Sequence, residues 1–174
     1  MTRAERGWLA GILDGEGSIA VWFSKRPNSK REHFHRQIVI YNTDPRIIHK
    51  ARDLVEQITG LGTMRTYAVG MSHYPGAFDR HSVHVTQPSH IIKVCRTLIP
   101  DLVGKKDQAI LMAQHLEWRA GMIRKPPEPC PEEVCRRDKK LAERLSYLNR
   151  FGPRTRNGHT EGSLKAEDMV SSPE

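Results

Sequence analysis

The first half of the chain changes twice between two patterns of hydrophobic and polar positions. Apolar residues at every third or fourth position predict helices, and apolar residues at every second position predict strands. Thr2 and Glu5 match a capping box, which begins a short helix running to about Asp14. Gly15 and Gly17 then interrupt the helical pattern.

Two strands are predicted next, on either side of a basic loop at 25–31. Residues 18–24 alternate, with Ala20, Trp22 and Ser24 on the more polar face. Residues 34–42 alternate as well and place apolar side chains on the opposite face. This pattern predicts a hairpin with one apolar and one polar surface.

The remaining elements complete an α+β pattern. Thr43, Asp44 and Pro45 begin a helix that ends at Gly60, and strands are predicted at about 63–69 and 81–87. Helices follow at 88–98, 105–124 and 131–150, the last two joined by a proline-rich linker at 126–129. We expect one four-stranded antiparallel sheet with an uncovered polar face and additional C-terminal helices. Residues 1–150 are expected to form one domain, followed by a polar tail at 151–174.

Composition adds a preference for polyanions. The formal net charge is +8, with a pI near 9.7. An excess of Lys and Arg favours phosphate backbones, although a ribosomal, membrane-surface or simply soluble protein could share it. Three cysteines, an odd number, favour a reducing compartment, namely the cytoplasm or an organelle. Secretion, a membrane span, a zinc site at Cys130 and Cys135, and a small-molecule cofactor are not expected.

The first helix carries small residues at helical spacing. Gly7, Ala10, Gly11 and Asp14 fall on one face when drawn as a helix. Each glycine inside a helix costs about 1 kcal/mol relative to alanine. Such a stripe is useful where another backbone approaches closely, so the pattern indicates a helix–helix interface.

Two carboxylates, Asp14 and Glu16, come at the end of this helix, where the helix dipole is already negative. A bound cation would make this placement favourable, and oxygen ligands beside a basic surface suggest Mg²⁺ for phosphoryl transfer. The alternative, weighed equally on spacing alone, is that both are solvated turn residues beside helix-ending glycines.

The segment from Leu9 to Gly17 resembles the LAGLIDADG motif of homing endonucleases in register across all nine positions. The order of elements is also similar, and residues 102–109 resemble the lysine-containing turn of the same enzymes. The resemblance extends to about Asn149. It implies the αββαββα LAGLIDADG fold, with a saddle-shaped sheet that binds double-stranded DNA.

The resemblance also implies roles for single residues. Glu16 would be the principal metal ligand, helped by the carbonyl of Gly15, with Mg²⁺ as the ion and Mn²⁺ as a substitute. Lys105 would orient the attacking water or stabilise charge on the phosphate. Asp44 falls beside a solvent-positioning residue, although the N-cap of the helix behind Pro45 is the favoured alternative. Asp14 would buttress the helix interface.

The single motif implies a homodimer, which would bind a roughly palindromic target. The motif helices would then meet through Gly7, Ala10, Gly11 and Asp14. The sheet would contact DNA through its polar face and its first loop, although any one of these side chains could simply be solvated. The DNA-contacting residues would be Trp22, Ser24, Lys25, Arg26, Lys30, Arg31, His35, Gln37, Tyr41, Arg65, Tyr67, Arg80, Ser82 and His84.

The function expected from this resemblance is metal-dependent cleavage of both strands of a long DNA target, by a protein encoded within an intron. The alternative is a protein that binds nucleic acid without cutting it, either an RNA maturase or a transcriptional regulator. A structural protein unrelated to nucleic acids would leave the glycines and the basic loop unexplained.

Overall fold

The computed structural model describes residues 1–25, 32–60, 65–69, 80–122 and 131–151, with only the backbone of 65–69, 80 and 151. The helices are α1 (Arg3–Glu16), α2 (Pro45–Thr59), α3 (Pro88–Leu98), α4 (Lys106–Met122) and α5 (Glu132–Phe151). The strands are β1 (Gly17–Lys25), β2 (Glu32–Asn42), β3 (Arg65–Val69) and β4 (Arg80–Val85). The tail expected at 151–174 lies almost wholly outside the described residues.

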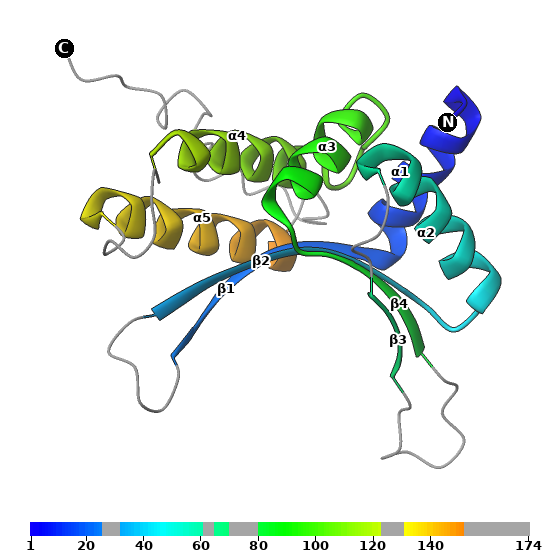
Figure 1. The fold of residues 1–174 in the computed structure, drawn as a ribbon, viewed down its shortest axis with the longest axis horizontal. Coiled ribbons are helices and arrows are strands. Elements are labelled where there is room, and N and C mark those ends of the chain that lie inside the picture. Colours follow the sequence, from blue (N-terminus) through cyan, green and yellow to red (C-terminus); the bar gives the residue numbers. More distant parts are fainter. Residues whose placement is uncertain (26–31, 61–64, 70–79, 123–130, 152–174) are drawn as a thin grey trace.

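The four strands form one antiparallel sheet in the order β1-β2-β4-β3. The sheet curves into an arch, and the helices lie over its convex side, so no described helix covers the concave side (Figure 1). The α+β class, the element order and the four-stranded sheet predicted from the sequence are therefore confirmed. The strand boundaries differ slightly, since β2 begins at Glu32 and β4 ends at Val85.

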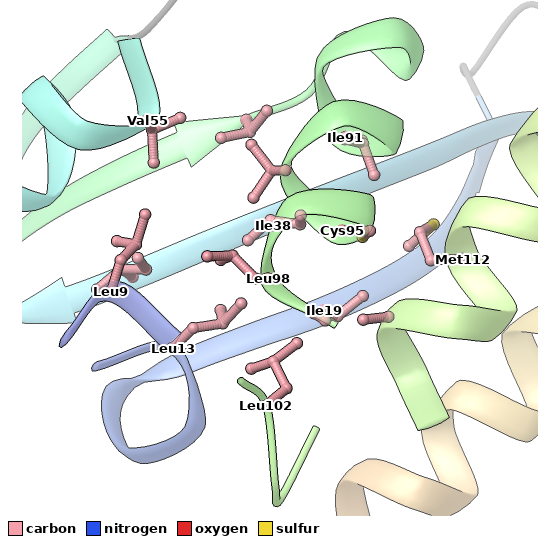
Figure 2. Close-up of a cluster of buried hydrophobic side chains, with 14 of the residues drawn as sticks. Leu9, Leu13, Ile19, Ile38, Val55, Ile91, Cys95, Leu98, Leu102 and Met112 are labelled. Atoms are coloured by element: carbon pink, nitrogen blue, oxygen red, sulfur yellow. The ribbon is translucent and has the colours of Figure 1, made fainter. Parts of the chain in front are cut away.

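The core lies between the convex side of the sheet and the helices. Alternate strand residues such as Ile19 and Ile38 point into it, as the period-two pattern predicts. They meet Leu9 and Leu13 from α1 and Leu98 from α3 (Figure 2). From α4, Met112 and Leu116 are buried in this core, whereas Met122, at the end of the helix, is 41% exposed.

The N-terminus of α1 is held by the predicted capping box. The Thr2 hydroxyl accepts a hydrogen bond from the Glu5 N–H, and the Glu5 carboxylate accepts one from the Thr2 N–H. At its other end α1 passes into β1 with no loop between Glu16 and Gly17.

Gly17 makes this direct junction possible. Its N–H donates to the carbonyl of Leu13, and a Cβ at position 17 would overlap Leu13 Cδ1 and lie 2.7 Å from Leu13 O. Only glycine fits so close to the last turn of the helix.

The C-terminal helix α5 covers β1 on the convex side (Figure 1). Its Asn149 side chain donates to the carbonyl of Ile19 at 3.1 Å, and Lys139 pairs with Glu32 at 3.2 Å near the other end of the hairpin. In the part of the chain that is described, no helix has the length and apolar character needed to cross a membrane.

We predict that Gly17→Ala destabilises the fold by about 1–3 kcal/mol, because the new methyl group would overlap the buried Leu13. Urea unfolding followed by circular dichroism would measure the loss. Gly121→Ala is the control, since a Cβ there would meet nothing within 4 Å. Equal stability of the two variants would contradict the tight junction.

Candidate nucleic-acid interface

The last turn of α1 carries two carboxylates with different surroundings. Glu16 is exposed at the end of the helix. Asp14 is half-buried, and its two oxygens accept hydrogen bonds of 2.8 Å from the N–H groups of Val103 and Lys105. Asp14 therefore anchors the 103–105 turn of its own chain, and only Glu16 presents a carboxylate to the outside.

Lys105 is brought to the same end of α1. Its Nζ donates to the backbone carbonyl of Asp14 at 2.5 Å, where the helix dipole is negative and a cation is favourable. Arg6 also pairs with Asp101, so the turn before α4 is tied to α1 near both ends of the helix. The structure thus places the predicted residues Lys105 and Glu16 at one end of one helix.

Asp44, the third predicted catalytic residue, has a structural role. Its side chain accepts from the Arg46 N–H at 2.9 Å as the N-cap of α2, and it forms an ion pair of 2.7 Å with the Arg46 guanidinium. Hydrogen bonds from the side chain and backbone of Arg46 lower the pKa of Asp44 to about 2. The structure therefore shows Asp44 as the N-cap of α2. Its contacts do not support the predicted catalytic role.

The exposed face of α1 consists of glycines. Gly7, Gly11 and Gly15 are exposed, and a Cβ on any of them would meet nothing within 4 Å in this chain. The prediction for Ala10 is wrong, because Ala10 is 0% exposed and packs into the core with Leu9. The exposed stripe follows i, i+4, i+8 spacing, and Ala10 lies beside it, on the flank of the helix that turns toward the core.

The kinds of oxygen ligand at this end of α1 suit a divalent ion, but there are too few of them. Carboxylate and carbonyl oxygens, as at Glu16 and Gly15, are the ligands that Mg²⁺ prefers. Among the described residues no group of three His, Cys, Asp or Glu side chains could hold a metal ion. The described part of the chain therefore offers only a partial set of ligands for such an ion at this end of α1.

The concave face of the sheet brings together residues that the sequence placed on one polar face. The register pairs Trp22 with His35 and Tyr41 with Ser82, and directly paired residues share a face. The face also contains Ser24, Gln37 and His84, and Lys25 is exposed at the end of β1. Arg65, Tyr67 and Arg80 belong to β3 and β4, at positions where the structure describes the backbone alone. Arg26, Lys30 and Arg31 lie outside the described residues.

One predicted contact on this face needs correction. Ser82 is fully buried, and its hydroxyl is hydrogen-bonded to His84 Nε2 at 3.0 Å. It supports the His84 ring and is not itself available to a ligand. His33, paired with Ser24, lies on the same face and was missed because the strand was predicted to begin at Phe34. The alternation of His33 with His35 and Gln37 was the available signal.

Two groups of side chains organise the face. Trp22 stacks on His35, with ring centroids 5.1 Å apart and planes 12° from parallel. His84 lies 3.4 Å from Gln37 Oε1 and meets the Tyr41 ring edge-on. Burial lowers the pKa of His84, which keeps its ring neutral at neutral pH.

Comparison with known proteins identifies the fold. No protein-family model and no curated protein sequence matches the chain. Among solved structures, the homing endonuclease I-CvuI in complex with its target aligns with a TM-score of 0.60 and 18% identity, covering 95% of this chain and 89% of that one. The intron-encoded I-CeuI aligns over 69% of this chain and 57% of its own, with 18% identity and a TM-score of 0.52.

A third homing endonuclease, I-TnaI, aligns at 17% identity and a TM-score of 0.50, over 83% of this chain and 95% of its own. The similar structures include one named as a LAGLIDADG homing endonuclease, I-GzeII. The chain therefore has the LAGLIDADG homing endonuclease fold.

We predict that Asp44→Ala lowers the midpoint of thermal unfolding at neutral pH, whereas Asp44→Asn, another good N-cap residue, retains most of the stability. Because the folded-state pKa of Asp44 lies below the ordinary value of about 3.9, its carboxylate stabilises the fold fully above that pH. This contribution is lost as the pH falls through about 2. The difference between wild type and Asp44→Ala, followed by calorimetry, should shrink over that range. Equal losses in the two variants would argue against the cap.

Proposed function

We propose that this chain, which has the LAGLIDADG fold, is a site-specific DNA endonuclease that works as a homodimer on a long, roughly palindromic target. The observation that carries the proposal is the end of α1. There an exposed Glu16 and a fixed Lys105 lie where α1 enters β1, the first strand of the open concave face. I-CvuI has been crystallised in complex with DNA target in the presence of Ca, and with another target in the presence of Mg.

The glycines of α1 support the homodimer. Gly7, Gly11 and Gly15 together cost this helix roughly 3 kcal/mol relative to alanine. Nothing in the described part of the chain requires them, because a Cβ on each would meet no described atom within 4 Å. A second α1 packed across this face would need them, since small residues let two helix backbones approach closely. The two-fold axis would then bring two copies of Glu16 together.

In this arrangement the residues of the chain have distinct tasks. Glu16 and the carbonyl of Gly15 would help to hold a divalent ion, Mg²⁺ or in its place Mn²⁺. That ion would supply Lewis-acid stabilisation and lower the pKa of water. Lys105 orients the water or stabilises the phosphate charge, and Asp14 holds Lys105 in place through the backbone of the 103–105 turn. The concave face positions the duplex.

A protein that binds nucleic acid without cutting it is the second candidate, either an RNA maturase or a transcriptional regulator. The exposed carboxylate favours the nuclease, because an acidic group beside phosphates weakens binding unless a cation lies between them. We further propose that the protein is encoded in an intron and acts in a reducing compartment.

We predict that Glu16→Gln abolishes cleavage while DNA affinity stays within about threefold of wild type, because the amide keeps the size of the side chain but loses its charge. The substrate would be a plasmid carrying a site selected from randomised duplexes, tested with Mg²⁺ and with EDTA. Glu143→Gln, on the exposed side of α5, is the matched control. Binding without cleavage by the wild-type protein would favour the second candidate instead.

We also predict that Gly11→Leu converts the dimer to a monomer, since the side chain has room within its own chain but not beneath a second α1. Light scattering would report a mass near 19.9 kDa for the variant and twice that for wild type. Gly121→Leu, at another open glycine, should stay dimeric. A dimeric Gly11→Leu protein would refute the proposed interface.

A further inference from the structure

The concave face contains one exposed large apolar side chain among its described residues. Trp22 is 41% exposed on β1, and its neighbours on the face are mainly polar. Single exposed apolar side chains are common on protein surfaces, so exposure alone does not distinguish this indole. What distinguishes it is that its ring is also stacked on a neighbouring side chain of the same face.

The Trp22 ring is held before any ligand arrives. It stacks on His35 with 12° between the planes, and the His35 Nε2 is 2.6 Å from Ser24 Oγ. The hydrogen bond fixes the imidazole, and the imidazole fixes the indole. A ligand that contacts Trp22 therefore meets an ordered apolar surface, so little side-chain entropy is lost on binding.

We propose that Trp22, supported by His35 and Ser24, determines a specificity for thymine in each half of the DNA target by packing against the C5-methyl group. This inference rests on the proposed function. In the major groove guanine, adenine and cytosine present polar atoms, and thymine alone adds a methyl group. Apart from its single N–H donor the indole ring is apolar, so most of its exposed surface matches that methyl group better than the polar base edges.

The strand geometry also fixes where this thymine should lie. Trp22 follows Glu16 by six residues along an extended strand, a distance of about 20 Å. Base pairs are spaced by about 3.4 Å, so the thymine should lie within about six base pairs of the target centre. Trp22, His35 and Ser24 all lie toward the end of the hairpin that is away from Glu16.

The experiment begins with selection of bound duplexes from a randomised library, using the full-length protein with Ca²⁺. Each thymine of the selected site is then replaced by deoxyuridine, which lacks only the methyl group. For wild type we expect about fourfold weaker binding for the thymine at the Trp22 position, and little change elsewhere. Trp22→Ala should bind the thymine and deoxyuridine duplexes equally, and Trp22→Phe should keep part of the difference.

Two results would overturn the inference and leave the proposed function standing. One is a selected site with no thymine within about six base pairs of its centre. The other is a deoxyuridine effect that persists in Trp22→Ala, since the methyl group would then be contacted by another residue. Selection that enriches no sequence would overturn the proposed function itself, together with the inference. The deoxyuridine test on wild type does not depend on the folding of any variant.

Discussion

The direct passage of α1 into β1 is the constraint on which the rest of the structure depends. Because no residue separates Glu16 from Gly17, the end of the helix is fixed at the start of the first strand. The same helix buries Leu9 and Leu13 in the core and leaves a glycine face bare. One short segment thus links the core, the exposed glycines of α1 and the concave face, so a change in its geometry would affect all three.

Asp14 extends this constraint to a distant part of the chain. Its carboxylate accepts two backbone hydrogen bonds from residues 89 and 91 positions further on, and charged acceptors form stronger bonds than neutral ones. Lys105 is thereby placed at the carbonyl end of α1, where its charge offsets the helix dipole. The two carboxylates of the motif therefore divide their work: one organises the chain, and the other remains available to a ligand.

The sequence predicted the elements and the polar face well because both follow from periodicity, which is a local property. It predicted Ala10 wrongly because a helical projection shows which residues share a side, while only packing against the sheet decides which side is buried. Ser82 was wrongly predicted to contact DNA for a related reason. Strand alternation tells which face a side chain points to, but its burial depends on the size of the neighbouring side chains. For Asp44, the sequence already contained the cap signal of an acidic residue before Pro45.

Net positive charge is a poor guide to which residues of the sheet are available to a ligand, as β2 demonstrates. Arg36 lies between His35 and Gln37 but points to the convex side, where its guanidinium lies 6.0 Å from the Phe34 ring and burial lowers its pKa. Nearby, Asp138 bonds to His115 and Arg119, which attaches α5 to α4, whereas the buried Arg36 Nε has no hydrogen-bond partner among the described residues. On the concave side, by contrast, Trp22 keeps an ordered surface exposed. A polar residue of this fold is therefore available to a ligand when its side chain points to the concave side and is not already bonded within the chain. Its charge matters less than these two properties.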